Sequence, residues 1–403
     1  MPSYDRRDFM RLTGTAAATS VLASACSGAS LGGDKKAESR GPVKVGLILP
    51  ESGVYVKIGA DQRNGWNLFL KLNGGKLGGR DVEVITADEG NGQDPKTTKA
   101  SAERLLKREQ VDVVCGIISS SSLIAIQDMF TEAKVPLIST NAGVKEVQGQ
   151  AYGWRTSFVN DHAGVALGEY IADNAGGTVA VIAADYPAGR DYVSGMQKRF
   201  KPAGGKLSGE PVMTPFPIGA KSFQPFLQQV EQQNPKAVFA FFAGADAVKF
   251  VKEYDKYGLS KKYQMYAPGF LTEGGVLTAE GEAAKGIMTS MHYSPDLDNA
   301  PNRKFVAEFQ KAYNMSPSCF SCAAYDAGWV LDRSIEACGD DLSPERLEAE
   351  IGKVGQVDSP RGPWKFGKNR SPVQNWYLRQ VRKDGDVLAN VVIDQLGALG
   401  DET

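Results

Sequence analysis

Four consecutive serines, Ser119 to Ser122, follow an apolar run that ends at Gly116-Ile117-Ile118. They stand where a buried strand should give way to a helix. Hydroxyl groups and free backbone N–H groups at a helix start can bind a carboxylate without any cation. Serines at such a position also serve simply as helix caps. The pattern therefore indicates an anion-binding loop or a capped helix, and the chemistry that it offers is binding.

Residue types that catalysis needs are scarce. The 403 residues contain only two histidines, His162 and His292, which leaves little for a histidine-based triad or metal site. No Gly-x-Ser-x-Gly elbow occurs. The glycine-rich segment 74–79 follows a predicted helix rather than a strand and lacks the spacing of a phosphate loop. We therefore expect no catalytic residue, no metal and no cofactor.

The cysteines leave one question open. Cys319 and Cys322 have the spacing of a metal or redox pair, but no second pair lies within reach. In an oxidising compartment this spacing allows a local disulfide, which export after cytosolic folding would disfavour. Cys115, inside an apolar run, is expected in the core.

Charge and length narrow the classes of protein further. Lys plus Arg number 46 and Asp plus Glu number 47, a formal net charge of −1. Such a chain has no global positive field for a polyphosphate, so we expect no nucleic-acid partner. The length suits two or three domains.

The N-terminal segment has the layout of an export signal. Residues 1–26 combine a charged start, a short weakly apolar stretch and small residues. Arg6-Arg7 with the next three residues resembles a twin-arginine signature, and Leu22 to Cys26 resembles a bacterial lipobox whose Cys26 would be acylated. Leu22 stands one residue farther from the cysteine than usual, so a plain export signal is the alternative. Residues 27–42 suit a flexible tether.

From residue 43 the chain alternates apolar runs with amphipathic helical stretches. In one of these, Trp66, Phe69 and Leu70 form a single apolar stripe at i, i+3 and i+4. A second such series starts at Asp161, and a hairpin is expected near 375–393. Alternation of this kind predicts two open, doubly wound parallel sheets. The expected strands are residues 43–50, 81–87, 111–118, 135–139, 178–185, 237–243 and 263–267.

In open α/β sheets the ligand crevice lies beyond the carboxyl ends of the strands. Besides the serine loop, we expect the segments 139–143, 185–189 and 241–246 to reach this crevice, since each follows a predicted strand.

Several short motifs together resemble the leucine/isoleucine/valine-type periplasmic binding proteins of ABC importers. The resemblance covers residues 43–393 and depends on the order and spacing of the motifs. They are residues 45–50 with Ser52-Gly53 and Gly59, Asp94-Pro95, Gly116 with its serines, residues 136–139, Arg155-Thr156 and Asp326-Ala327. It implies the type I fold, with two lobes joined by three hinge crossovers near 158–161, 291–294 and 367–372. The resulting division is an export signal 1–26, a tether 27–42, lobe 1 (43–159 plus 293–368), lobe 2 (160–292 plus 369–396) and a tail 397–403.

The resemblance also implies a ligand-binding set. A ligand carboxylate would be held by the backbone and hydroxyl groups of Ile118 and Ser120. The other residues of the set are Ser119, Ser121, Asn141, Ala142, Gly143, Tyr55, Tyr186, Phe242, Gly244 and Phe270. Amino-acid binders place an acidic residue near Phe270, but the nearest here is Glu273. The aromatic residues favour an aromatic or other apolar acid, and a branched-chain amino acid or amide stays open.

The resemblance implies a receptor that captures its ligand by hinge closure and delivers it to an ABC permease. It would be an exported, periplasmic or cell-surface monomer, attached to the membrane only through a lipid on Cys26. A ligand-sensing subunit of a signalling receptor has the same fold and is the first alternative. An exported enzyme is disfavoured by the missing base and metal ligands.

Overall fold

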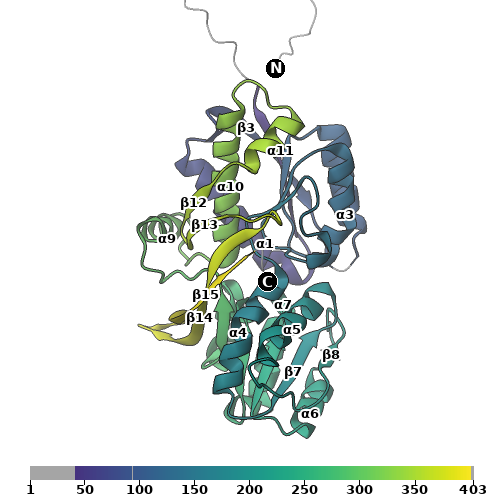
Figure 1. The fold of residues 1–403 in the computed structure, drawn as a ribbon, viewed down its shortest axis with the longest axis vertical. Coiled ribbons are helices and arrows are strands. Elements are labelled where there is room, and N and C mark those ends of the chain that lie inside the picture. The colour runs from purple at the N-terminus through teal and green to yellow at the C-terminus, as the bar shows by residue number, and fades with distance from the viewer. Residues whose placement is uncertain (1–40, 93, 401–403) are drawn as a thin grey trace, which may run out of the picture. The chain divides into compact units, whose positions relative to one another are not determined.

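A computed structural model describes residues 41–92 and 94–400 and has two open α/β sheets, each at the centre of one lobe (Figure 1). The predicted export signal, Cys26 and the tether up to residue 40 lie outside the described residues, as does the end of the predicted tail. Within 41–92 and 94–400, no helix is both long and apolar enough to cross a membrane.

The first sheet has the strand order β2-β3-β1-β4-β5-β6. All neighbours pair in parallel except β2, which is antiparallel to β3. The strands are β1 (Val43–Leu49), β2 (Lys76–Leu77), β3 (Arg80–Asp88), β4 (Val113–Gly116), β5 (Leu137–Ser139) and β6 (Gly153–Arg155).

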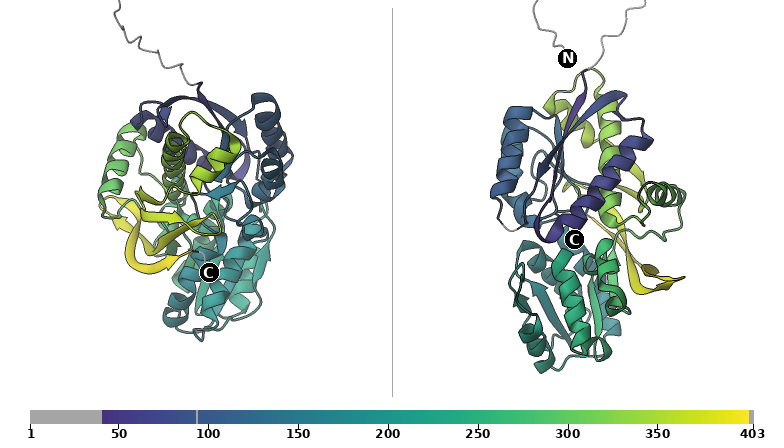
Figure 2. Two further views of the ribbon diagram at one scale, coloured as in Figure 1. Left: turned by 45° about the horizontal axis from the view of Figure 1, so that its top comes forward. Right: turned by 180° about the vertical axis from the view of Figure 1, so that it is seen from behind.

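Strand β1 explains why helices cover both faces of this sheet. Val43, Val45, Leu47 and Leu49 belong to one apolar cluster, and Ile48 belongs to another on the opposite face, because successive side chains of a strand alternate. Figure 2 shows the sheet between two helix layers. The first layer holds α1 (Val56–Leu72), α10 (Cys319–Cys338) and α11 (Pro344–Ile351), and the second holds α2 (Lys96–Glu103) and α3 (Ser120–Ala133).

The second sheet begins with the parallel strands β8-β7-β9-β10-β11 and continues into antiparallel β14, which also pairs with β13 and β15. Its strands are β7 (Val179–Ala184), β8 (Val212–Thr214), β9 (Ala237–Phe241), β10 (Gln264–Pro268), β11 (Met288–Met291), β12 (Gln356–Ser359), β13 (Gly362–Phe366), β14 (Pro372–Asp384) and β15 (Val387–Leu399). The remaining helices are α4 (Asn160–Asn174), α5 (Pro187–Phe200), α6 (Gln224–Gln232), α7 (Gly244–Lys256), α8 (Gly275–Glu280) and α9 (Ala300–Tyr313).

Two glycines let α4 and α5 pack with their backbones in close contact. A Cβ atom on Gly164 would lie 2.4 Å from the Tyr192 carbonyl oxygen, and one on Gly195 would lie 2.2 Å from the Asp161 carbonyl oxygen. Any larger residue would push the helices apart. This contact holds the start of α4 against the middle of α5.

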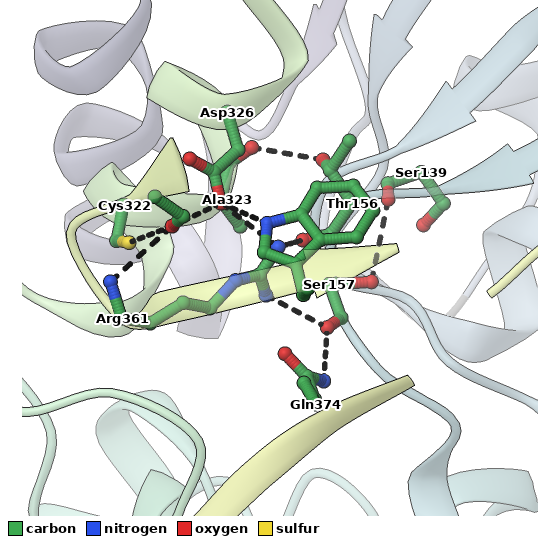
Figure 3. Close-up of polar contacts among 10 residues, drawn as sticks. Ser139, Thr156, Ser157, Cys322, Ala323, Asp326, Arg361 and Gln374 are labelled. Atoms are coloured by element: carbon green, nitrogen blue, oxygen red, sulfur yellow. Dashed lines mark hydrogen bonds and ion pairs between the residues drawn. The ribbon is translucent and has the colours of Figure 1, made fainter. Parts of the chain in front are cut away.

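The chain passes between the lobes three times, after β6, after β11 and between β13 and β14, in agreement with the expected fold class. A buried polar network ties two of these passages together (Figure 3). Arg361 pairs with Asp326 at 2.9 Å and donates to the carbonyl oxygens of Thr156 and Ser157, and Gln374 donates to Ser157 as well. The residue boundaries of the two lobes stay a prediction, since β13 packs its Trp364 in the first lobe while pairing with β14 of the second sheet.

Candidate ligand-binding site

A cavity with about 330 Å³ of space, part of it open to solvent, lies between the lobes. Both lobes line it, and of the described lining residues none is Asp, Glu, Lys or Arg. The lining residues are Tyr55, Ile58, Ile118, Ser120, Asn141, Ala142, Phe158, Asn160, Tyr186, Ala188, Tyr192, Phe241, Ala243, Phe270 and Phe320.

Five helices begin at this cavity. Ser120 and Asn160 are the first residues of α3 and α4, Ala188 and Phe320 are the second residues of α5 and α10, and Ala243 is the N-cap of α7. The first turn of a helix carries free N–H groups and a partial positive charge. In α3 the N–H groups of Ser120 and Ser121 have no acceptor among the described residues. These helix starts therefore offer partial positive charge to an anion, although none of the described lining residues is Lys or Arg.

Polar side chains of the cavity connect the two lobes. The Tyr55 hydroxyl donates to the Tyr186 hydroxyl at 3.1 Å, and burial raises the pKa of both phenols, so both stay neutral. The Asn160 amide donates to Ser120 Oγ at 3.2 Å and accepts from the Tyr192 hydroxyl at 3.4 Å. Neutral hydroxyl and amide groups can act as donors to an anion.

Aromatic rings form the rest of the wall. Phe158 and Phe270 lie 4.8 Å apart between centroids, and Tyr192 lies 4.2 Å from Phe241. Phe320 extends the group at 6.0 Å from Phe270. Rings at these distances and tilts make favourable aromatic contacts, so a planar apolar ligand would find matching surfaces here.

Seven of the twelve residues expected to bind ligand line this cavity, namely Tyr55, Ile118, Ser120, Asn141, Ala142, Tyr186 and Phe270. The other five, Ser119, Ser121, Gly143, Phe242 and Gly244, do not line it. Whether the seven hold a ligand stays a prediction.

The role expected for the Ile118 amide needs correction. Its N–H donates at 2.8 Å to the carboxylate of Glu89, a fully buried side chain, and the Ser119 N–H donates to the same carboxylate at 2.7 Å. The Ser119 hydroxyl donates to the Gly92 carbonyl at 2.8 Å. These two residues therefore bind an internal carboxylate, and Ser120 is the serine of this loop that lines the cavity.

Three further residues of the predicted set have structural roles. Phe242 follows Phe241 along the chain, so its ring turns to the opposite face and packs against Phe223 and Phe250. Gly143 lies against the Phe158 carbonyl, where a Cβ atom would come within 2.6 Å. Gly244, at φ +61°, lies against the Val54 carbonyl of the other lobe, where a Cβ atom would come within 2.3 Å.

Glu273 does not reach the cavity. One carboxylate oxygen pairs with Arg379 at 2.8 Å, and the other accepts the Cys319 backbone N–H at 2.7 Å. Its charge is already matched inside the protein, so it is not available to a ligand ammonium group.

Cys319 and Cys322 are both free and buried, so the local disulfide that their spacing allows is not formed. The two residues lie in the first turn of α10, and Cys322 Sγ instead lies 3.9 Å from Ser359 Oγ. In the described part of the chain no group of three or more His, Cys, Asp or Glu side chains could hold a metal ion.

Sequence reasoning did not place eight lining residues in the binding set. Five of these stand in segments that the sequence did single out: Phe158 and Asn160 at the first crossover, and Ala188, Phe241 and Ala243 at strand ends. The remaining three, Ile58, Tyr192 and Phe320, come from helix surfaces, where an aromatic or aliphatic residue has the same pattern whether it faces a core or a ligand.

Comparisons with known proteins agree on one class. A sequence model of the family described as "Periplasmic binding protein" matches residues 42–386. Leu/Ile/Val-binding protein homolog 6 of Brucella melitensis is 32% identical over 350 residues, which cover 85% of this chain and 88% of that protein.

Two solved structures have the same fold over nearly their whole length. An ABC transporter solute-binding protein from R. palustris in complex with benzoate is 34% identical, with a TM-score of 0.82, and the match covers 90% of this chain and 98% of that one. A solute-binding protein from Rhodopseudomonas palustris in complex with 3,4-dihydroxybenzoic acid is 29% identical, with a TM-score of 0.83 and coverage of 90% and 99%.

Proposed function

Since the chain belongs to the periplasmic binding protein family, we propose that its ligand is a small aromatic carboxylate held between the lobes. This is an exported solute-binding protein of an ABC importer, which binds a small molecule and works with a membrane permease, and it is not an enzyme.

The observation that carries the proposal is a cavity with aromatic walls, five helix N-termini and no charged side chain among its described lining residues. A carboxylate would accept from the N–H groups of Ser120 and Ser121 in the field of α3. A ring would lie among Phe158, Phe241 and Phe270. An α-ammonium group would be buried without a carboxylate partner, which is costly.

Hinge closure follows from the fact that residues of both lobes line the cavity. Ser120, on the first lobe, can hold the ligand while the lobes are apart, and Tyr186 and Phe241, on the second, add contacts only when the lobes meet. A ligand shifts the population toward closure by its extra affinity for the closed form. Small-angle scattering should therefore detect compaction on saturation, and an unchanged radius of gyration would contradict this mechanism.

A thermal-shift screen tests the ligand class. Benzoate, 4-hydroxybenzoate and 3,4-dihydroxybenzoate should each raise the melting temperature, because a ligand at 100 times its Kd stabilises by about 2.7 kcal/mol. Stabilisation by leucine, isoleucine or valine alone would remove the aromatic proposal. That outcome would favour the second candidate, a branched-chain amino acid, to which the names of the Brucella relatives point.

A pair of matched variants locates the site. Ala188→Leu should abolish the shift by filling the cavity, whereas the same change at Ala100, on the exposed surface of α2, should leave it unchanged. Binding that survives Ala188→Leu would place the ligand elsewhere.

We also propose that Cys26 carries a lipid anchor and that the protein acts as a monomer. Membrane fractionation should find a Cys26→Ala variant in the soluble fraction, because it lacks the acylated cysteine. An unchanged distribution between membrane and soluble fractions would contradict the anchor. A dimer in size-exclusion chromatography would contradict the second statement.

A further inference from the structure

A buried carboxylate lies directly behind the loop proposed to bind the ligand. Glu89 follows the last residue of β3, and its carboxylate accepts the N–H groups of Ile118 and Ser119 at 2.8 and 2.7 Å. Its backbone carbonyl accepts the Thr98 hydroxyl at 2.6 Å, which fixes the residue in place. The side chain has no exposed surface.

The position of Glu89 matters because the same loop faces the cavity. The two amides that it binds immediately precede Ser120, the first residue of α3, and both Ile118 and Ser120 line the cavity. A ligand carboxylate at the Ser120 and Ser121 amides would therefore share one helix N-terminus with Glu89, on the other side of the loop. Two anions at one helix end repel each other more strongly inside a protein than in water.

The charged surroundings of Glu89 offer no compensation. The groups that act on it are the Ile118 and Ser119 amides of the loop, the Ser122 hydroxyl of α3 and the Asp88 carboxylate of β3. Tyr55, from the turn before α1, also lies within electrostatic range and is neutral. No Lys or Arg appears among these described neighbours. Burial therefore outweighs the two amides and raises the pKa of Glu89 to about 7.

We propose that Glu89 takes up a proton from solvent when a carboxylate ligand binds at the start of α3, so that capture of the ligand is coupled to protonation. The inference rests on the proposed function, because it requires an anionic ligand at Ser120. The bound anion disfavours the charged form of Glu89, and the neutral form removes the repulsion between the two carboxylates.

The sign of the pH dependence follows by linkage. Below pH 7 Glu89 is already mostly protonated, so binding takes up little further proton and the affinity is highest. Above pH 7 the ligand must raise the pKa of an ionised Glu89, and the affinity falls as the pH rises. Each unit by which the ligand raises this pKa gives about a tenfold loss of affinity between the low-pH and high-pH limits.

Calorimetry measures the proton directly. Benzoate is titrated into the full chain at pH 7.5 in phosphate and in Tris, whose ionisation enthalpies differ, so the difference in heat gives the protons bound. We expect net uptake by the wild type and none by Glu89→Gln, whose affinity should also be nearly independent of pH.

Asp112→Asn is the matched control. The Asp112 carboxylate also accepts a backbone N–H, from Lys44 at 2.8 Å, and burial raises its pKa. Asp112 stands just before the N-terminal end of β4, however, whereas the cavity lies beyond the C-terminal ends of the strands. On titration with benzoate, Asp112→Asn should take up as many protons as the wild type does.

The outcomes separate the two proposals. If benzoate does not bind the wild type, the proposed function fails. If benzoate binds without proton uptake, or if Glu89→Gln takes up the same amount, the coupling is wrong. Should Glu89→Gln not fold, NMR of ¹³C-labelled glutamate carboxyls in the wild type decides: one carbon should titrate near pH 7 and move to higher pH with benzoate, and its absence overturns the inference.

Discussion

The Tyr55 hydroxyl of the first lobe donates a hydrogen bond to the Tyr186 hydroxyl of the second lobe at 3.1 Å. Tyr55 ends the turn before α1, and Tyr186 is the N-cap of α5, so the bond joins two segments that are 131 positions apart in the chain. Both side chains are buried at the cavity. The bond can exist only while the lobes are in contact.

Removing this bond should weaken ligand binding without unfolding the protein. For Tyr55→Phe we expect a loss of benzoate affinity of about 2- to 13-fold, the equivalent of the roughly 0.5–1.5 kcal/mol of one hydrogen bond. Calorimetry measures the change. Tyr170→Phe, on α4 outside the cavity, should bind as the wild type does. Equal affinities for Tyr55→Phe and the wild type would mean that the bond does not stabilise the closed form.

Lys145 holds the lobes together at a second place. Its backbone N–H donates to Asp191 at 3.3 Å, and its Nζ pairs at 2.8 Å with Asp161, a side chain that is 2% exposed. Asn160 links this group to the cavity, since its amide donates to both Asp191 and Ser120.

Lys145→Met should therefore lower ligand affinity about tenfold, because the loss of the ammonium leaves the buried Asp161 carboxylate without its partner. Affinity should also become less sensitive to salt. Lys134→Met breaks an exposed pair with Glu345 and serves as control, since such pairs contribute little. A Lys145→Met protein with the affinity and salt dependence of the wild type would exclude this role.

The parts of the molecule that could be predicted from sequence are those that local pattern determines. The buried strand of residues 43–49 and the helix carrying Trp66 and Phe69 follow from apolar periodicity, and both are present. Some short strands were missed, for example β6 and β8, because three residues are too few to establish a period, whereas the equally short β5 lies in the longer segment 135–139 that was expected.

The candidate site was less predictable because it depends on partners distant in the chain. The local sequence shows no acceptor for the Ile118 amide, and only the fold brings the Glu89 carboxylate within hydrogen-bonding distance of it. Glu273 likewise stands near the position of an ammonium ligand in sequence, yet Arg379, 106 positions away, neutralises it. The partner of a buried charge is determined by tertiary contacts, which the hydrophobic periodicity of a sequence does not predict.

Asp326 on α10 should be essential for stability. It pairs at 2.9 Å with Arg361, and both side chains are 1% exposed. Asp326→Ala leaves the guanidinium buried and unpaired, and we expect a loss of about 3–5 kcal/mol in the free energy of unfolding, measured with urea. Glu336→Ala, on the exposed face of the same helix, should change it by less than about 0.5 kcal/mol. A loss for Asp326→Ala as small as that of the control would contradict the role of the pair.

His162 should make the protein sensitive to acid. The imidazole is buried at the start of α4, and burial lowers its pKa to about 4, while the unfolded chain keeps a value near 6.5. Above pH 6.5 neither state binds the proton, so this group has no effect there. As the pH falls from 6.5 to 4, the unfolded state gains a proton that the folded state does not, and stability declines by about 3 kcal/mol in total.

Buried acids with raised pKa values, such as Glu89 and Asp61, act in the opposite direction, so the wild-type profile alone does not isolate the histidine. The comparison is therefore between the wild type and His162→Gln, whose free energies of unfolding are measured from pH 7.5 to 4.5. The variant should lose less stability on acidification than the wild type, whatever its stability at neutral pH. Parallel profiles would mean that His162 has the same pKa in the folded and the unfolded protein, which its burial opposes.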